Sequence, residues 1–333
     1  MISGKKEQIS NNLELWERDG VEVELKEWQG RDALYLEGIH KAIFLREAIS
    51  YPAYRFTAEV AIPGDVAFAG LVFGAQDSDN YELVYLAPYE IQYDPIQNGS
   101  MTWQIHNGPA YQKPLPNTTG VWQTLTVEVQ PGGARVFFGE DAQEAALTLP
   151  NLQHGGKPGK VGLWSYLPCY FRNLVIEEIP QQQLLPSQEV GLAGLQAESF
   201  VTEWQVSAPY QGESVEPQEW NKAFVNEDGT LNLNRLYRAE KGAVVQLSSG
   251  VELEEERESV LTLGYSDAIR LWVNEEEVYS GSWRWNPPHS DGRVRPTHAS
   301  VPIRWKKGHN SIRAELTHEE PFGWGLAVRT GLN

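Results

Sequence analysis

The sequence predicts an all-β chain of two tandem antiparallel β-sandwich domains, and three observations lead to this. Most segments with a clear pattern alternate apolar and polar residues and are rich in β-branched and aromatic side chains. Clusters of Gly, Pro, Asn and Asp separate these segments, as in IPGD, QNGS and QPGG, where a hairpin must reverse. The length of 333 residues exceeds what one hydrophobic core usually covers. No window predicts an amphipathic helix of useful length.

Short strands are expected along both halves of the chain. In the first half the alternating pattern covers 21–25, 33–38, 54–62, 69–76, 81–86, 101–106, 122–130, 134–140 and 161–166. In the second half it covers 200–207, 243–249, 259–266, 269–281, 298–305, 310–316 and 324–330, with a tight hairpin at VNEEEVY. Several short strands with regular turn signals are typical of a sandwich or barrel.

One stretch in the middle of the chain breaks the alternation. IPQQQLLPSQEVGLAGLQ has two prolines that bracket glutamines, followed by small residues, and this composition is typical of a linker. We therefore expect a first domain over residues 1–180, a linker over 181–197 and a second domain over 198–333.

Composition and charge exclude some classes of partner. Apolar residues make up 41% and charged residues 22% of the chain, as in folded globular proteins. The net charge of −18 disfavours nucleic acid and anionic membrane surfaces, and no apolar run approaches the roughly 18 residues that membrane insertion needs. MISGKKEQISNN lacks an apolar core and predicts no signal peptide. A cytoplasmic location and secretion with a removed leader both stay open.

The order of segments in the first half resembles a known superfamily. KAIFLRE, YRFTAEVAIPG, AGLVFGAQDSDNYELVYLAPY and KVGLWSYLPCYFRNLVIEE follow one another as in the concanavalin A-like lectin/glucanase superfamily. That superfamily includes laminin G-like modules and DUF1080-like modules of glycan-degrading bacteria. The resemblance covers roughly residues 10–179 and implies a structural role for the closing pattern of Gly159, Gly162, Leu163, Trp164, Phe171 and Asn173.

Two further resemblances point to carbohydrate. GYSDAIRLWVNEEEVYSG and KKGHNSIRAEL in the second half resemble galactose-binding-like jelly-roll modules, which often accompany carbohydrate enzymes. Between Asn80 and Tyr111 the chain keeps the Q-Y-x-P-x-x-N-G and W-Q elements of a bacterial subgroup. It departs from that subgroup at Ala87 and Tyr89, which stand where Arg and His are expected. The resemblance therefore implies an oligosaccharide or polysaccharide as partner, with a changed ligand or a lost activity.

Candidate sugar-binding residues lie between positions 87 and 111. In MTWQIH the alternation puts Met101, Trp103 and Ile105 on a core face and Thr102, Gln104 and His106 on a solvated polar face. The long loop over 87–99 contributes tyrosines that can stack on a pyranose ring, or that merely cover the sheet edge. The expected carbohydrate-binding residues are Tyr89, Gln92, Tyr93, Asn98, Gln104, His106 and Tyr111.

Two other classes of function remain open for the same surface. A glycoside hydrolase or polysaccharide lyase would use Glu82 or His106, its catalytic candidates, but a glycosidase needs a carboxylate pair that the sequence does not show. A module that binds another protein is the second alternative. Since sandwiches host all of these functions, the fold does not choose among them.

In the second half, Trp283, Trp285 and Trp324 are candidates for sugar stacking, for packing against the first domain, or for ordinary core packing. No HExxH spacing or other metal signature occurs, and no cofactor is expected. The one conceivable calcium site lies near Asp77 and Asp79 in QDSDN, where a turn needs the same residues.

Overall fold

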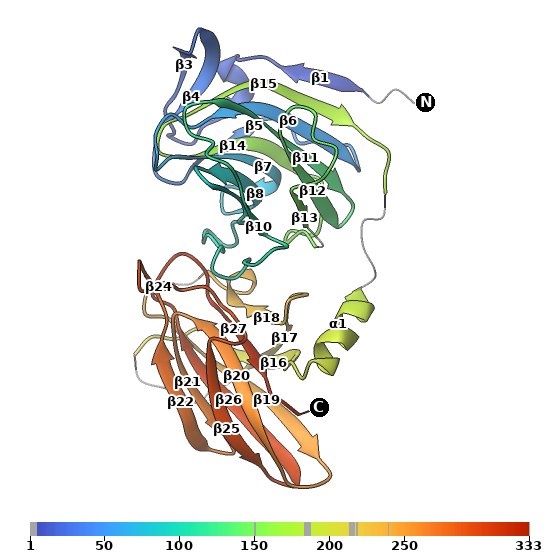
Figure 1. The fold of residues 1–333 in the computed structure, drawn as a ribbon, viewed down its shortest axis with the longest axis vertical. Coiled ribbons are helices and arrows are strands. Elements are labelled where there is room, and N and C mark those ends of the chain that lie inside the picture. The colour runs from blue at the N-terminus through green and yellow to red at the C-terminus, as the bar shows by residue number, and fades with distance from the viewer. Residues whose placement is uncertain are drawn as a thin grey trace. The chain divides into compact units, whose positions relative to one another are not determined.

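The computed structural model describes residues 5–149, 151–182, 188–212, 217, 219–238 and 240–332, and it is nearly all β (Figure 1). The chain forms two compact units. The first comprises Met1–Gly99 and Gly108–Leu185, and the second comprises Ser100–Asn107 and Pro186–Asn333. The predicted fold class is confirmed, since antiparallel sheets make up both units.

The first unit is a sandwich of two antiparallel sheets in its described residues. Sheet A has the order β13-β12-β11-β6-β15-β4-β3, with β1 beside β15. Its strands are β1 (Lys6–Ile9), β3 (Val23–Trp28), β4 (Arg31–Leu36), β6 (Tyr54–Ala61), β11 (Trp122–Gln130), β12 (Gly133–Phe138), β13 (Leu147–Leu149) and β15 (Cys169–Glu178). Sheet B has the order β10-β9-β8-β7-β14-β5-β2. Its strands are β2 (Trp16–Glu17), β5 (Lys41–Leu45), β7 (Phe68–Asp77), β8 (Asn80–Ala87), β9 (Glu90–Tyr93), β10 (Gln112–Pro114) and β14 (Lys160–Tyr166). The short helix η1 is Leu13–Leu15.

Strand β6 shows why this sequence forms a two-layer sandwich. Phe56, Ala58 and Val60 are fully buried in the core between the sheets. Arg55 and Thr57 alternate with them and are only partly buried, because successive side chains of a strand point to opposite faces. The outer face of sheet A is therefore polar at these positions.

The second unit is also a two-layer structure. Sheet C has the order β17-β16-β19-β26-β21-β22 and sheet D the order β18-β27-β20-β25. Sheet C comprises β16 (Glu203–Ser207), β17 (Trp220–Phe224), β19 (Val244–Leu253), β21 (Ala268–Val273), β22 (Glu276–Ser282) and β26 (Gly308–Thr317). Sheet D comprises β18 (Thr230–Asn232), β20 (Arg257–Ser266), β25 (Ala299–Trp305) and β27 (Gly325–Arg329). The remaining elements are the β23 (Trp285–Asn286) and β24 (Ser290–Asp291) ribbon, η2 (Leu233–Arg235) and α1 (Gln188–Ala197).

The structure confirms every expected strand except the one over 101–106. The VNEEEVY hairpin joins β21 to β22, with Asn274 and Glu275 both at positive φ, as a tight two-residue turn requires. Helix α1 lies in the stretch expected as a linker, and the sequence analysis predicted no helix there. The chain passes from one unit to the other after residues 99, 107 and 185, whereas a single linker over 181–197 was expected.

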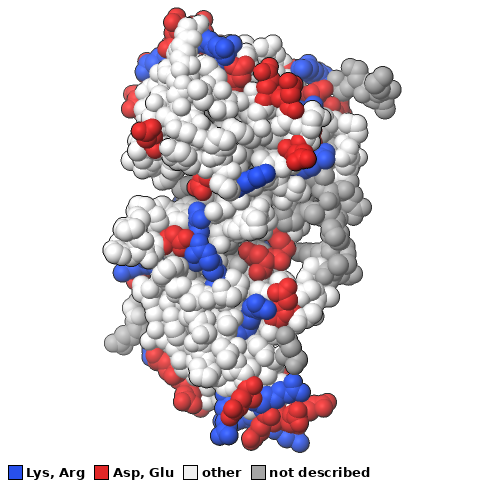
Figure 2. All heavy atoms as spheres, viewed as in Figure 1, with Lys and Arg blue, Asp and Glu red and all other residues white. Residues whose placement is uncertain are grey.

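Charged side chains of both signs are interspersed on the face that Figure 2 draws, with Lys and Arg in small separate groups. The acidic run ELEEER is part of such a mixed group, since Glu255 pairs with Arg257 at 3.4 Å and Glu252 lies 3.6 Å from His309. In the described part of the chain, no helix has the length and apolar character needed to cross a membrane.

Candidate ligand-binding site

Residues 100–107, which contain the motif MTWQIH, belong to the second unit. They form a loop, so the strand predicted over 101–106 is wrong. The physical reason is a local turn: the N–H groups of Ile105 and His106 both donate to the carbonyl oxygen of Thr102, at 2.9 Å. The side-chain amide of Asn107 also donates to the carbonyls of Gln104 and Ile105, at 3.0 and 3.2 Å, and such local bonds of polar side chains to the backbone compete with a sheet ladder.

Further bonds attach this loop to the rest of the second unit. The backbone N–H of Gln104 donates to the carbonyl of Phe322 at 3.0 Å, and the N–H of Val294 donates to the carbonyl of Gln104 at 2.8 Å. The side-chain amide of Asn107 donates to the Val294 carbonyl at 3.0 Å. The loop is thus bonded at its middle and at its end.

Three glycines of the second unit make room for the loop. A Cβ atom at Gly292 would lie 2.2 Å from Nε2 of Gln104, and one at Gly325 would lie 2.5 Å from Cδ1 of Ile105. A Cβ at Gly323 would lie 3.0 Å from both side chains. Since real Cβ atoms do not approach so closely, the residues of the second unit are fitted to residues 100–107.

The structure places Gln104 and His106 in the interior. Both are fully buried, and so is Thr102, so the expected solvated face does not exist. The Gln104 Oε1 accepts a hydrogen bond from Ser266 Oγ at 2.8 Å, and its Nε2 donates to Glu320 Oε2 at 3.2 Å. The His106 Nδ1 lies 3.0 Å from the Thr102 hydroxyl. Gln104 therefore holds the loop in place.

Next to Gln104, the buried carboxylate of Asp267 holds the backbone at Glu319 and Glu320. Asp267 is fully buried and accepts the backbone N–H groups of Glu319 and Glu320 through Oδ2, at 2.5 and 2.9 Å. Burial raises the pKa of Asp267 to about 6, while the two N–H groups act in the opposite direction. Glu320 Oε2 in turn accepts the backbone N–H of Trp285 at 2.9 Å. The chain of bonds from Asp267 fixes the backbone position of Trp285.

Trp285 is the exposed member of an aromatic group. The residue is 51% exposed, and its ring meets Phe322 edge-on, with centroids 6.4 Å apart. Phe322 packs at 5.5 Å on Trp103, and the guanidinium of Arg293 lies 5.3 Å from the centre of the Trp103 ring. We call Trp103, Trp285 and Phe322 the Trp285 cluster.

Charged residues adjoin the Trp285 cluster in the chain. Arg284, which precedes Trp285, forms an ion pair with Glu319, and half of its side chain is exposed. Glu320 follows Glu319 and already bonds Trp285 and Gln104. An exposed aromatic ring can stack on the apolar face of a ligand ring, and guanidinium and carboxylate groups can bond hydroxyls.

The other two candidate tryptophans have packing roles. Trp324 is fully buried in the core of the second unit. Trp283 is partly buried, lies 4.1 Å from the His298 ring, and donates its indole N–H to the carbonyl of Arg293 at 3.2 Å. Of the three, Trp285 alone presents a large exposed surface.

The first-unit candidates are mostly interior. Gln92, Tyr93 and Tyr111 are buried, and the rings of Tyr93 and Tyr111 stack with centroids 5.9 Å apart. Asn98 is half-buried in a turn at φ 50°. Tyr89, at 65% exposed, is the one open ring of this set.

The catalytic candidate Glu82 is enclosed by the protein. Its Oε2 accepts the Tyr93 hydroxyl at 2.5 Å and its Oε1 accepts the backbone N–H of His154 at 2.7 Å. Burial raises the pKa of this carboxyl, and these bonds oppose the rise. Glu82 and His106 are both buried, and they belong to different units. A catalytic role for either stays a prediction.

The conceivable calcium ligands form a turn. Asp77 Oδ1 accepts the backbone N–H of Asp79 at 2.8 Å and the amide of Asn80 at 3.0 Å. Such local bonding is what an aspartate does in a tight turn. Within the described ranges, no group of three or more His, Cys, Asp or Glu side chains is placed to hold a metal ion.

An aromatic layer on the first unit was not predicted. On sheet B, Phe68 stacks on Tyr85 at 5.5 Å and on Tyr166 at 5.2 Å, and Tyr85 stacks on Trp164 at 5.4 Å. The exposed His40 continues the layer beside Tyr166 at 5.1 Å. The residues come from four separate segments, so no single motif could have revealed the layer.

Sequence reasoning found Gln104 and Trp285 but assigned them to different domains. It missed Asp267, Glu320 and Phe322, which join them. Gln104 and Glu320 are 216 positions apart in the sequence. The segments around Asp267 (SDA) and Phe322 (PFGW) match no known motif, so nothing in the sequence signals this contact.

Comparisons with known proteins give fold likenesses only. No family model and no curated protein matches the chain. Among solved structures, the chain is similar to the carbohydrate-binding module CBM66 from Bacillus subtilis, with 13% identity, coverage of 49% of this chain and 95% of that one, and a TM-score of 0.36. The chain is also similar to the Bacillus licheniformis β-glucanase, with 12% identity, coverage of 54% of this chain and 99% of that one, and a TM-score of 0.34. A third similar structure is the exoplasmic/lumenal domain of VIP36 in its Ca²⁺/Man3GlcNAc-bound form, with 10% identity, coverage of 54% of this chain and 89% of that one, and a TM-score of 0.37. The residues of this chain, and not these likenesses, carry the function proposed next.

Proposed function

We propose that this chain is a carbohydrate-binding protein whose sugar ligand stacks on Trp285 in the second unit. The observation that carries the proposal is a tryptophan with half of its surface exposed, whose backbone N–H bonds Glu320, while the backbone N–H of Glu320 bonds the buried Asp267. An exposed indole costs free energy in water unless a partner covers it. A fixed position reduces the conformational entropy that binding would otherwise cost.

The surroundings of Trp285 suit a sugar. A pyranose ring has an apolar face that packs on an aromatic plane, and hydroxyls at its edge that need planar donors and acceptors. Arg284, the residue before Trp285, and its ion-pair partner Glu319 supply both kinds of group. The concanavalin A-like and galactose-binding-like resemblances of the two halves favour the same class of ligand. Tyr89 and the other candidates between 87 and 111 form a less favoured binding site than Trp285, because most of them are buried.

Substitution of Trp285 tests the proposal. A glycan array on the full chain should identify a ligand, and Trp285→Ala should weaken its binding at least about tenfold, or roughly 1.4 kcal/mol, by isothermal titration calorimetry. The free energy of unfolding should change by less than about 1 kcal/mol because half of the surface of Trp285 is exposed.

Trp220→Ala is the matched control, since Trp220 is an exposed tryptophan on β17 of the same unit and has no place in the Trp285 cluster. Its affinity should equal that of the wild type. An array without any glycan signal, or equal losses in the two variants, would contradict the proposal.

A further inference from the structure

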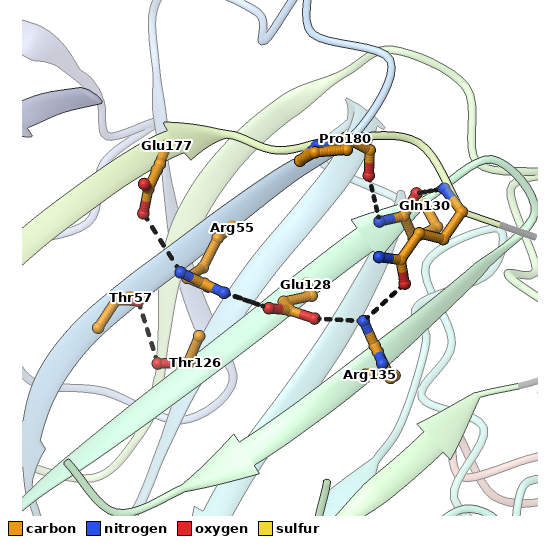
Figure 3. Close-up of polar contacts among 9 residues, drawn as sticks. Arg55, Thr57, Thr126, Glu128, Gln130, Arg135, Glu177 and Pro180 are labelled. Atoms are coloured by element: carbon orange, nitrogen blue, oxygen red, sulfur yellow. Dashed lines mark hydrogen bonds and ion pairs between the residues drawn. The ribbon is translucent and has the colours of Figure 1, made fainter. Parts of the chain in front are cut away.

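The first unit carries a groove on the outer face of sheet A that no role above uses. The groove has a volume of about 620 Å³, and side chains of β6, β11, β12 and β15 form its floor. Residues 139–145, which follow β12, form a wall. Figure 3 shows the polar side chains on this floor.

A row of alternating charge crosses the floor. Glu177, Arg55, Glu128 and Arg135 occupy directly opposite positions on β15, β6, β11 and β12. Arg55 donates to Glu128 at 2.5 Å and to Glu177 at 3.3 Å, and Arg135 contacts Glu128 at 2.9 Å (Figure 3). Two arginines and two glutamates cancel, so this row is polar but has no net charge.

The groups in this row differ in what they can offer a ligand. The side chain of Glu128 is 8% exposed and is held between the two arginines. Those of Arg55 and Arg135 are 41% and 33% exposed, so they reach the groove. Guanidinium groups donate from a fixed plane, and buried acceptors on one side of that plane keep it oriented.

A second row lies beside the first. Thr57 and Thr126 are opposite each other on β6 and β11, and their hydroxyls bond at 3.0 Å. Each hydroxyl has one donor and two acceptor positions, so their mutual bond leaves one donor and several acceptor positions for a ligand. Phe137, half-buried, is opposite Thr126 on β12 and adds an aromatic surface.

We propose that this groove is a second carbohydrate site, which binds a neutral oligosaccharide across β6, β11 and β12. Sugar hydroxyls donate and accept, which matches a floor of alternating arginine, glutamate and threonine. The exposed Glu140 and Asp141 on the wall disfavour a polyanion such as a uronate chain. This goes beyond the function proposed above, because it places a site on the other unit and does not depend on Trp285.

Hydrogen exchange with defined hexasaccharides locates this site. The full chain carrying Trp285→Ala is incubated with cellohexaose, laminarihexaose, mannohexaose or xylohexaose at millimolar concentration, and with charged hexamers of galacturonate and glucosamine. At least one neutral hexamer should slow exchange in residues 134–146, and galacturonate should not. Protection by a charged hexamer alone, or by none, would overturn the proposal.

Threonine variants test the groove itself. The double variant Thr57→Val, Thr126→Val keeps the shape of the floor and removes these two hydroxyls. It should weaken the binding of the neutral hexamer at least about tenfold. Thr148→Val is the control, because Thr148 lies opposite Arg135 on β13 but outside the groove lining. Equal affinity of the double variant and the control would overturn the proposal. Exchange around β23 and β24 in the wild type reports the Trp285 cluster separately, so the two proposals can fail independently.

Discussion

Ile105→Ala should lower the free energy of unfolding of the second unit by about 2–5 kcal/mol, as removal of a fully buried aliphatic side chain does. Ile105 is 0% exposed and packs with Val294 and Ala327 in the second unit. The chain segments before and after residues 100–107 belong to the first unit. Gly325 lies directly against its Cδ1 position, so little can collapse into the space left by the side chain. Hydrogen exchange during denaturation, followed in β26 and β8, assigns the loss to one unit.

Two other isoleucine variants are the controls for Ile105→Ala. Ile91→Ala removes an equally buried side chain from the core of the first unit, so it should destabilise β8 and leave β26 unchanged. Ile39→Ala, at an exposed position, should change stability by no more than about 0.5 kcal/mol. An effect of Ile105→Ala that appears in β8 and spares β26 would show that residues 100–107 are not part of the second unit.

The second large effect concerns residues 186–333 expressed alone. Without residues 100–107 this fragment loses the buried Ile105 and exposes the partners of Gln104, which include Ser266 and Glu320. The combined loss is on the order of 5 kcal/mol or more, which is comparable with the about 5–15 kcal/mol that keeps a typical domain folded. The fragment should therefore melt far below the second unit of the full chain, or not fold cooperatively.

A peptide of residues 98–109 provides the control for this fragment. Added in excess, it should raise the denaturation midpoint of 186–333, because a ligand of the folded state stabilises that state by mass action. A peptide with Ile105→Ala should be much weaker. A fragment that is as stable without the peptide as with it would contradict the assignment of this segment.

Local patterns explain what the sequence could predict. The alternation in segments such as 54–62 and 259–266 identified strands, because one face of each is buried against a core. The VNEEEVY turn was predictable for a similar reason, since its chemistry lies within a few residues. Period-two patterning is therefore informative wherever the partner face is an ordinary sheet interior.

The same pattern misled at MTWQIH. Met101, Trp103 and Ile105 alternate with polar residues, yet the polar side chains are buried: Thr102 and His106 bond each other, and the partners of Gln104 lie in a distant part of the sequence. Trp285 could be named as a candidate from its neighbourhood of turn residues. Asp267 and Glu320 could not, because their role depends on hydrogen bonds between loops far apart in the chain.

The most direct test of the central claim is a crystal structure of the full chain bound to the glycan that an array identifies. We expect a pyranose ring parallel to the Trp285 indole, with its hydroxyls within hydrogen-bond distance of Arg284 or Glu319. Sugar density elsewhere, with the Trp285 ring still uncovered at saturating ligand, would contradict it.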